Sequence, residues 1–127
     1  MNKEKVIIII EPFPVIRYGL KSLIEKEISI PIFSFKSFTD AKINLHFFDI
    51  QIVFIEILIN NKIDFSQLDY LFENLKIQNI VVFTSIEDDG LFIDYINSKK
   101  ITFLSKNNTP KTILKTIKEN FKMNLLV

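Results

Sequence analysis

The chain has 127 residues, a length that fits one domain and leaves no room for a second. Its 16 Lys and Arg residues balance 15 Asp and Glu residues to a formal net charge of +1, so no bulk charge attracts nucleic acid or an anionic membrane. Cysteine is absent and His46 is the only histidine, which excludes disulfides, thiolate zinc sites, histidine clusters and serine triads. We interpret His46, which lies beside two phenylalanines, as an ordinary, partly exposed residue.

No apolar stretch approaches the roughly 18 residues that a membrane-spanning helix needs. The apolar run at residues 6–10 is too short for a signal peptide, and no small-residue cleavage site follows it. We therefore expect a cytoplasmic protein that makes no membrane contact.

Five short apolar runs alternate with amphipathic stretches along the chain. The runs are rich in β-branched or aromatic residues and apolar at successive positions, which is typical of strands buried on both faces of a parallel sheet. We predict strands at residues 6–10, 31–35, 52–55, 80–83 and 101–104.

The segments after these runs have helical length, with apolar residues three or four positions apart. Each begins with a feature that suits a helix start: a first-turn proline, a hydroxyl or carboxylate cap, or an acidic cluster. The second helix is the weakest and is predicted to end near Phe47. The expected starts are Pro14, Ser37 or Thr39, Asp64, residues 87–89, and Thr109 with Pro110. The third helix is predicted to carry an apolar face of Leu68, Leu71, Phe72 and Leu75.

Five strands that alternate with five helices predict a doubly wound α/β fold, in which helices cover both faces of a five-stranded parallel sheet. Right-handed crossovers favour the flavodoxin-like strand order 2-1-3-4-5. We predict one domain over residues 1–122, and a tail at residues 123–127 that continues the last helix or begins a linker. In such sheets the functional crevice lies beyond the carboxyl ends of the strands, so the residues after each run are the candidates.

Candidate site residues follow four of the five predicted strands. Glu11 and Pro12 follow the first strand, Glu56 ends the third, Thr84 ends the fourth and Lys106 follows the fifth. In this order they resemble the receiver domains of two-component response regulators. Those domains carry an acidic pair, a phospho-accepting aspartate, Thr or Ser, and Lys at the corresponding places.

Two runs are similar to one subfamily of these receivers. Residues 11–20, Glu-Pro-Phe-Pro-Val-Ile-Arg-Tyr-Gly-Leu, are similar to its Asp-Asp-His-Pro-Leu-Val-Arg-x-Gly-Leu run, and residues 106–113 are similar to its Lys-Asp-x-Ser-Pro-x-x-Leu run. The resemblance extends from about residue 5 to residue 122, and members usually carry a C-terminal helix-turn-helix domain. It implies the N-terminal part of a transcriptional regulator, with DNA contacted only through an output domain absent from this chain.

The chain departs from the family where phosphate is taken up. Family receivers hold Mg²⁺ with compact carboxylates and accept a phosphoryl group on aspartate. Here Glu56 stands at the acceptor position, and Glu11 and Pro12 stand where the acidic pair belongs. Pro12 offers no side-chain oxygen, and Glu56 sets its carboxylate one methylene farther out. We therefore predict an atypical receiver, or pseudo-receiver, that is not an enzyme, takes up no phosphate and needs no metal or other cofactor.

In the family, activation moves the Thr or Ser hydroxyl toward the phosphoryl group and turns an aromatic side chain of the fifth strand inward. The matching positions are Thr84 and Phe103. Our hypothesis is that Glu56 pairs with Lys106, with or without a bond to Thr84, and permanently holds one conformation as a partial mimic of the phosphorylated state. The alternative is that Glu56 points into water near Lys106 and fixes nothing.

Family members usually contact partners through the fourth helix, fifth strand and fifth helix. Opposed charges on this face suit a symmetric homodimer or a protein partner, although lysines at helical spacing are also typical of a solvated face. The candidate interface residues are Asp94, Lys99, Lys100, Lys111, Lys115 and Lys118.

Two other functions remain open from the sequence. One is a conventional, phosphorylatable receiver that holds Mg²⁺ with Glu11 and a substituted ligand. The other is a small flavodoxin-like enzyme or ligand-binding domain, which is disfavoured because neither Gly19 nor Gly90 lies in a phosphate-binding loop.

Overall fold

The computed structural model describes residues 3–77, 79–85, 90–99 and 101–125. Its main sheet has five parallel strands in the order β2-β1-β3-β6-β7, which is the predicted order 2-1-3-4-5. The doubly wound α/β fold is thereby confirmed. The strands are Glu4–Ile10 (β1), Ile32–Phe35 (β2), Phe48–Ile55 (β3), Asn79–Thr84 (β6) and Thr102–Ser105 (β7).

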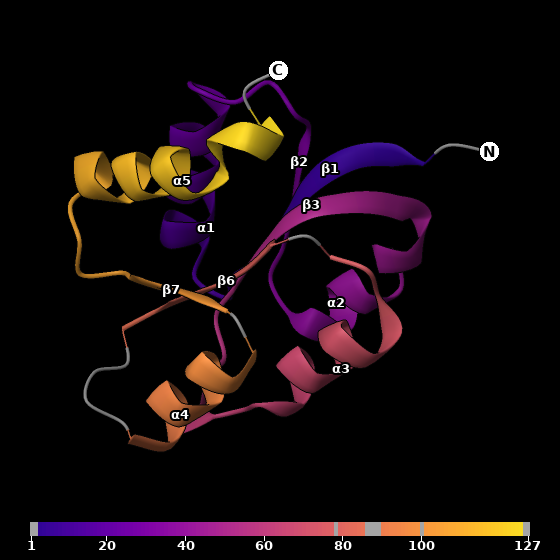
Figure 1. Ribbon diagram of the computed structural model, residues 1–127, viewed down its shortest axis with the longest axis vertical. Helices are drawn as coiled ribbons and strands as arrows, with labels where there is room; N and C mark the ends of the chain where they lie inside the picture. Colours follow the sequence, from indigo (N-terminus) through magenta and orange to yellow (C-terminus); the bar gives the residue numbers. More distant parts are fainter. Residues whose placement is uncertain (1–2, 78, 86–89, 100, 126–127) are drawn as a thin grey trace.

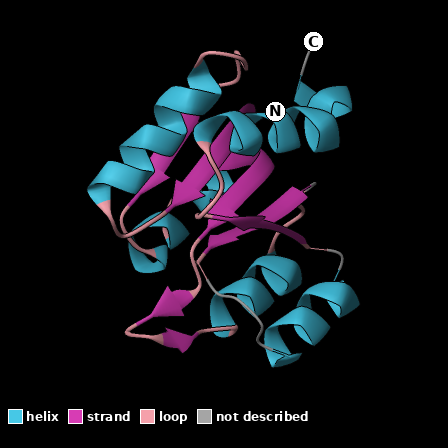
Figure 2. Ribbon diagram, turned by 90° about the vertical axis from the view of Figure 1, so that its left-hand side faces the viewer, coloured by secondary structure: helices cyan, strands magenta, loops and turns pink. Residues whose placement is uncertain are grey.

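Helices cover both faces of this sheet (Figure 1 and Figure 2). The helices α1 and α5 lie on one face, and α2, α3 and α4 lie on the other. Their bounds are Pro14–Glu25 (α1), Phe38–Lys42 (α2), Ser66–Asn74 (α3), Gly90–Lys99 (α4) and Pro110–Leu125 (α5).

The alternation of side chains along β1 builds two cores. Ile7 and Ile9 belong to the cluster under α1 and α5, whereas Val6, Ile8 and Ile10 belong to the cluster under α2, α3 and α4. All five side chains are 2% exposed or less. Burial on both faces explains why the strand is apolar at every position, since each such side chain contributes roughly 1.5–3 kcal/mol when it leaves water.

The starts of α1, α2 and α5 follow the predicted chemistry. The first helical residues of α1 and α5 are the predicted prolines. Ser37 Oγ caps α2 by accepting a hydrogen bond from the backbone N–H of Asp40 (3.2 Å), and Thr109 Oγ1 caps α5 by accepting one from Thr112 (3.2 Å). Residues 87–89, the predicted start of the fourth helix, lie outside the described residues.

The prediction that the second helix runs to about Phe47 is wrong. The helix α2 ends at Lys42, and a separate 3-10 turn, Leu45–Phe47 (η1), leads into β3. Ala41 and Leu45 are both fully buried and four positions apart, which is helical spacing. The sequence therefore suggests one continuous helix, although the chain leaves the α-helix between these two residues. Strand β3 begins earlier than predicted, at Phe48. The prediction missed the start of the strand because its first two residues are only partly buried and lack the apolar pattern of an inner strand.

Phe72, predicted to lie on the apolar face of the third helix, is 38% exposed, and the Lys99 ammonium lies 5.9 Å from its ring centroid. Leu68 and Leu71 are fully buried and fill the positions of α3 that face the sheet. The residue after Leu71 is turned by about 100° around the helix and therefore points outward.

A short antiparallel hairpin that the sequence did not predict follows β3. It is formed by Leu58–Ile59 (β4) and Lys62–Ile63 (β5), and Figure 2 shows it set apart from the main sheet. The turn residues Asn60 and Asn61 have φ angles of 51° and 64°. A two-residue hairpin turn with both residues left-handed suits asparagine, which tolerates this conformation better than most residues.

A hydrogen-bonded pair ties α4 to α3. The Tyr95 hydroxyl donates to Asp69 Oδ1, and the Tyr95 ring stacks on Phe65 with 4.4 Å between ring centroids. Burial, together with the Asp69 carboxylate, raises the pKa of Tyr95 well above its usual value. The tyrosine therefore stays protonated and able to donate at all ordinary pH values.

The helix α5 continues through Leu125, so residues 123–125 extend the last helix, which is one of the two predicted alternatives for the tail. Within the described ranges, neither α5 nor any other helix has the length and apolar character needed to cross a membrane.

Candidate functional site

The predicted site residues meet at the carboxyl edge of the sheet. Glu11 directly follows β1, Glu56 directly follows β3 and Lys106 directly follows β7. Backbone hydrogen bonds extend the sheet to these positions: the N–H of Glu56 donates to the carbonyl of Ile10 (3.0 Å), and that of Lys106 donates to the carbonyl of Thr84 (3.0 Å). Parallel pairing therefore brings side chains from distant parts of the chain together.

Lys106 pairs with both acids. Its Nζ lies 2.7 Å from Glu56 Oε1, as a hydrogen bond, and 2.5 Å from Glu11 Oε1, as an ion pair without hydrogen-bond geometry. The side chains of Glu11, Glu56 and Lys106 are 1%, 4% and 10% exposed, so water screens these charges little. The predicted contact between Glu56 and Lys106 is present, and the alternative in which Glu56 points into water is wrong.

The main chain holds the second oxygen of each carboxylate. Glu11 Oε2 accepts a hydrogen bond from the backbone N–H of Phe13 (2.9 Å), and Glu56 Oε2 accepts one from that of Leu58 (3.1 Å). Both loops thus repeat one arrangement, a carboxylate bonded to the N–H two residues further on. Each acid is fixed between its own loop and the shared ammonium.

Arg17 supports the loop after β1 from inside the protein. Its side chain is buried, and NH1 donates to the carbonyl of Glu11 (2.7 Å) and, at a longer distance, to that of Pro12 (3.4 Å). Glu11, Glu56, Arg17 and Lys106 together carry no net formal charge. Arg17 is a positioning residue that the sequence analysis did not identify, although its place in the run at residues 11–20 was a usable signal.

Two aromatic rings flank the Lys106 ammonium. Nζ lies 5.7 Å from the ring centroid of Phe13 and 5.8 Å from that of Phe83, distances at which the face of a ring attracts a cation. Phe13 is 61% exposed, whereas Phe83 is buried. Neither ring was predicted from the sequence, because phenylalanine is not among the residue types that mark the family site.

The predicted switch residues lie on neighbouring strands. Thr84 ends β6 and is fully buried. Phe103 lies on β7 and is 40% exposed, and its ring meets that of Phe92 from α4 edge-on, with 5.6 Å between centroids and 76° between ring planes. Phe103 therefore connects the outer strand to α4.

The described interface candidates divide between two helices. Asp94 and Lys99 lie exposed on α4, and the other lysines lie on α5. Lys118 Nζ lies 3.3 Å from Glu27 Oε2, which follows α1, so this side chain points toward α1. Lys100 lies outside the described residues. The α5 candidates are Lys111, Lys115 and Lys118.

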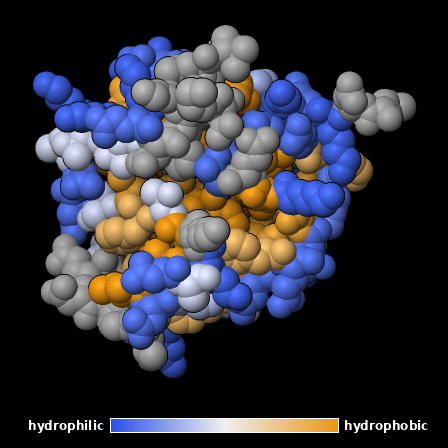
Figure 3. All heavy atoms as spheres, viewed as in Figure 1, coloured by the Kyte–Doolittle hydropathy of each residue, from blue (hydrophilic) through white to orange (hydrophobic). Residues whose placement is uncertain are grey.

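An apolar band separates these two sets of charges. Figure 3 shows apolar side chains gathered between α5 and the helices α3 and α4, over the outer edge of the sheet. Ile93 of α4 is 48% exposed and Phe103 of β7 is 40% exposed. Large apolar side chains are therefore accessible on the face that the sequence analysis identified as the interface.

Asp64 receives several hydrogen bonds between the hairpin and α3. The Ser66 hydroxyl and the Ser66 backbone N–H (2.9 Å) donate to Oδ1, and Gln67 Nε2 donates to Oδ2 (3.4 Å). The Ser66 hydroxyl is the main reason that the pKa of Asp64 lies below its ordinary value of 3.8. The prediction that Asp64 caps the third helix is wrong: α3 begins at Ser66, Phe65 is its N-cap residue without a side-chain cap, and Asp64 lies one residue earlier.

We expect Asp64→Ala to lower the free energy of unfolding by about 1 kcal/mol at neutral pH, the usual net effect of losing hydrogen bonds such as those from Ser66 and Gln67. Because the pKa is lowered by folding, this stabilisation is present above pH 3.8 and is lost as the pH falls through the folded-state value. Urea unfolding at neutral and acidic pH measures the difference between the two proteins. Asp94→Ala, which removes an exposed carboxylate, is the control, and a difference that stays constant with pH contradicts the assignment.

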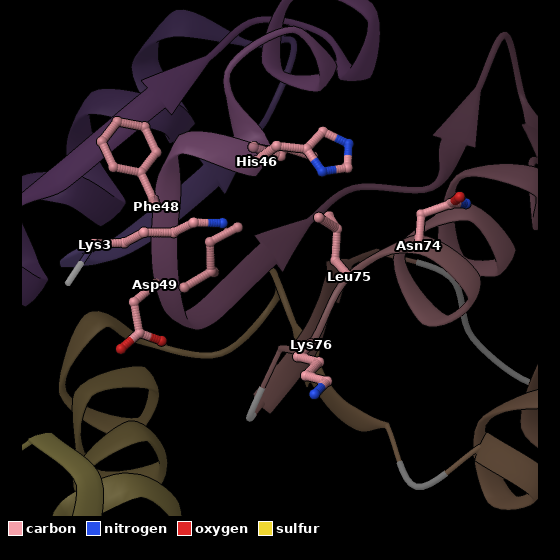
Figure 4. A pocket seen from close by; sticks show the side chains of 9 residues that line it. Lys3, His46, Phe48, Asp49, Asn74, Leu75 and Lys76 are labelled. Atoms are coloured by element: carbon pink, nitrogen blue, oxygen red, sulfur yellow. The ribbon is translucent and has the colours of Figure 1, made fainter. Parts of the chain in front are cut away.

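His46 lies at the opposite end of the sheet. Its side chain is exposed and its Nε2 lies 3.2 Å from the Tyr70 hydroxyl. Figure 4 shows the pocket of about 470 Å³ that it lines, with Phe48 and Asp49 of β3 and with Leu75 beyond α3. In the part of the chain that the structure describes, no three His, Cys, Asp or Glu side chains gather as metal ligands.

The fold is that of response-regulator receiver domains. The chain is similar to CheY4 of Vibrio cholerae (15% identity, TM-score 0.72, covering 92% of this chain and 98% of that one) and to a response regulator from Thermotoga maritima (14%, 0.78, 94% and 98%). It is also similar to RcsB from Salmonella enterica serovar Typhimurium (16%, 0.74), where the match covers 91% of this chain and 66% of RcsB. No protein-family model and no curated protein sequence matches the chain.

Proposed function

We propose that this chain is an atypical receiver module of a response regulator, which controls its partners by protein contacts and without phosphorylation. The observation that carries the proposal is the position of Lys106 Nζ, 2.5 Å from Glu11 and 2.7 Å from Glu56. The receiver fold and the place of these residues at its carboxyl edge support the assignment as a receiver module. The chemistry of the pocket supports a role without phosphorylation.

The donor set does not suit magnesium. Mg²⁺ needs near-octahedral contacts with oxygen atoms at about 2.0–2.1 Å. Pro12 has no side-chain oxygen, and the Oε1 atoms of Glu11 and Glu56 both face an ammonium. Lys106 and Arg17 already balance the two carboxylates, so no further cation is needed for neutrality. These features favour a module that uses no metal or other cofactor and catalyses no reaction.

The pair of Glu56 and Lys106 also suits a permanent hold on one conformation, in which Phe103 is 40% exposed and not turned inward as in family activation. A hydrogen bond between charged groups contributes roughly 1.5–3 kcal/mol, enough to bias a two-state element by about tenfold or more. Lys106 follows β7, the strand that carries Phe103 against α4. Fixing the position of Lys106 therefore also restrains β7, and β7 is part of the proposed interface.

That interface consists of α4, β7 and α5, and it binds a second copy of the chain or another protein. The exposed apolar side chains of this face, Ile93 of α4 and Phe103 of β7, supply contact area, and the charged residues of α4 and α5 supply orientation. RcsB, which is similar in structure, has been solved as dimers bound to DNA. This chain spans only part of the length of RcsB. We infer an analogous cytoplasmic role in transcription, with DNA contacted by a separate output domain.

Sedimentation at a series of concentrations tests the mimic and the interface together. Glu56→Ala leaves Lys106 paired with Glu11 alone and is expected to weaken self-association by about tenfold, the equivalent of 1.4 kcal/mol. Glu25→Ala is the matched control, because it removes a carboxylate whose ion pair with Lys21 (3.9 Å) is exposed.

Association of Glu56→Ala equal to that of the wild-type chain contradicts the mimic. A wild-type chain that stays monomeric at every concentration contradicts self-association through this face.

A further inference from the structure

A groove of about 410 Å³ runs between α1 and α5, which lie on the same face of the sheet (Figure 1). Its volume lies within the range of about 300–1,000 Å³ that small-molecule sites occupy. Its lining extends along α1 from Val15 to Lys26, and the helical rise between these two residues makes it about 16 Å long. The groove is therefore elongated along α1.

The floor of the groove is apolar. Leu20 of α1, Phe83 of β6 and Ile113 of α5 line it and are 4%, 5% and 7% exposed. The remaining apolar residues of its lining are Val15, Ile16, Leu23 and Pro110. Such a surface suits the unbranched apolar body of a ligand, which gains free energy when it leaves water.

Gly19 lies on the wall of the groove, inside α1. Glycine is the least favourable residue in a helix interior after proline, because it loses the most backbone freedom on folding. A Cβ atom added at Gly19 would meet no heavy atom of a neighbouring side chain or element within 4 Å, and the φ angle of this glycine is not positive. Neither packing within the described chain nor backbone conformation therefore requires glycine here. The open space beside α1 suits a ligand that lies close to the helix backbone.

The charged residues that line the groove are two lysines, Lys26 and Lys106, and no described carboxylate lines it. Lys106 is already paired with Glu11 and Glu56. Lys26 is exposed and makes no ion pair within the described residues. An anionic group at the Lys26 end of the groove therefore meets a complementary charge, whereas a cationic group is repelled.

The carboxylates on either side of Lys26 in the sequence have other partners. Glu25 Oε1 lies 3.9 Å from Lys21 Nζ, and Glu27 Oε2 lies 3.3 Å from Lys118 Nζ. These two acids are thus balanced by other lysines, and the charge of Lys26 remains available to a ligand.

We propose that this groove binds an elongated organic carboxylate. The alkyl chain of the ligand packs on the apolar floor beside Gly19, and its carboxylate pairs with Lys26. The proposal goes beyond the phosphate-independent role described above and does not rest on it, because neither carboxylate of that site lines the groove.

Titration of the ¹⁵N-labelled chain with decanoate below its micelle concentration, followed by proton–nitrogen correlation spectra, tests the proposal. We expect saturable shifts of the amide signals of Gly19, Leu23 and Ile113. The matched probe decylammonium has the same alkyl length with a cation in place of the carboxylate. It is expected to bind about tenfold more weakly, because attraction to Lys26 is replaced by repulsion.

Two variants test the two parts of the contact. Gly19→Leu places a side chain in the open space of the groove and is expected to fold, since an added Cβ meets no neighbouring atom, and to weaken decanoate binding by at least about tenfold. Lys26→Met removes the ammonium and is expected to weaken decanoate binding by about fivefold. Lys21→Met removes a lysine of the same helix outside the groove and is the matched control, with unchanged affinity.

The absence of a saturable shift, equal affinity for the two probes, or equal loss in Lys26→Met and Lys21→Met overturns the proposal. Unchanged affinity in a folded Gly19→Leu also overturns it. If Gly19→Leu does not fold, the comparison of the two probes and the two lysine variants decides.

Discussion

Replacing Lys106 with methionine is expected to lower the free energy of unfolding by about 3–5 kcal/mol, the usual effect of breaking a buried ion pair from one side. The substitution keeps an unbranched side chain of similar length but removes the ammonium between Glu11 and Glu56. Urea unfolding followed by circular dichroism measures the change.

The size of this effect follows from burial. Glu11 and Glu56 are 1% and 4% exposed, so neither carboxylate regains full hydration when the lysine is lost. Their remaining hydrogen bonds come from the backbone N–H groups of Phe13 and Leu58. Two buried like charges then face each other across the former position of the ammonium, which is costly at low local dielectric.

A rescue experiment separates charge from packing. Adding Glu11→Gln and Glu56→Gln to Lys106→Met removes both uncompensated charges, and the amide oxygens still accept from the same backbone groups. We expect this triple variant to recover most of the lost stability. Lys115→Met, at an exposed position of α5, is the control for loss of a lysine. A small loss in Lys106→Met, or no recovery in the triple variant, contradicts the assigned pairing.

The fold was predictable because inner strands leave a simple pattern. The residues of β1 from Val6 to Ile10 are apolar at every position since both faces of the strand are covered. The helix starts were predictable for a similar local reason, as with Ser37 and Thr109, which accept hydrogen bonds from the N–H three residues further on. Local chemistry therefore indicated most elements and their order.

The predictions were wrong or incomplete where the pattern of apolar residues does not reveal the backbone conformation. Ala41 and Leu45 have helical spacing and are buried, but the chain between them leaves the α-helix after Lys42. The turn at Asn60 and Asn61 has left-handed backbone angles, although an Asn-Asn pair is a weaker turn signal than Asn-Gly. Neither feature can be read from apolar spacing alone.

The site was predictable in its residue types and only partly in its geometry. The carboxyl ends of parallel strands share one edge, so Glu56 and Lys106 were expected to meet. That Lys106 also reaches Glu11, and that Arg17 holds the carbonyl of that residue, depends on side-chain reach within the folded protein.

The second large effect expected is a complete absence of phosphate uptake. A phosphodonor needs an acceptor oxygen that is free to attack in line and a cation that neutralises the incoming group. Glu56 has one oxygen at 2.7 Å from an ammonium and the other at 3.1 Å from a backbone N–H. Pro12 removes one ligand that would hold the cation. We therefore expect these contacts of Glu56 to prevent its attack on a phosphodonor, and the remaining ligands to bind Mg²⁺ poorly.

Intact-mass spectrometry after incubation with acetyl phosphate and Mg²⁺ tests this account most directly. A receiver domain that carries the aspartate acceptor, treated in parallel, shows that the donor is active. We predict that the mass of this chain stays unchanged while that of the aspartate receiver rises by one phosphoryl group. A magnesium-dependent gain of one phosphoryl group on this chain, lost in Glu56→Ala, would contradict the assignment of Lys106 as the permanent partner of both acids.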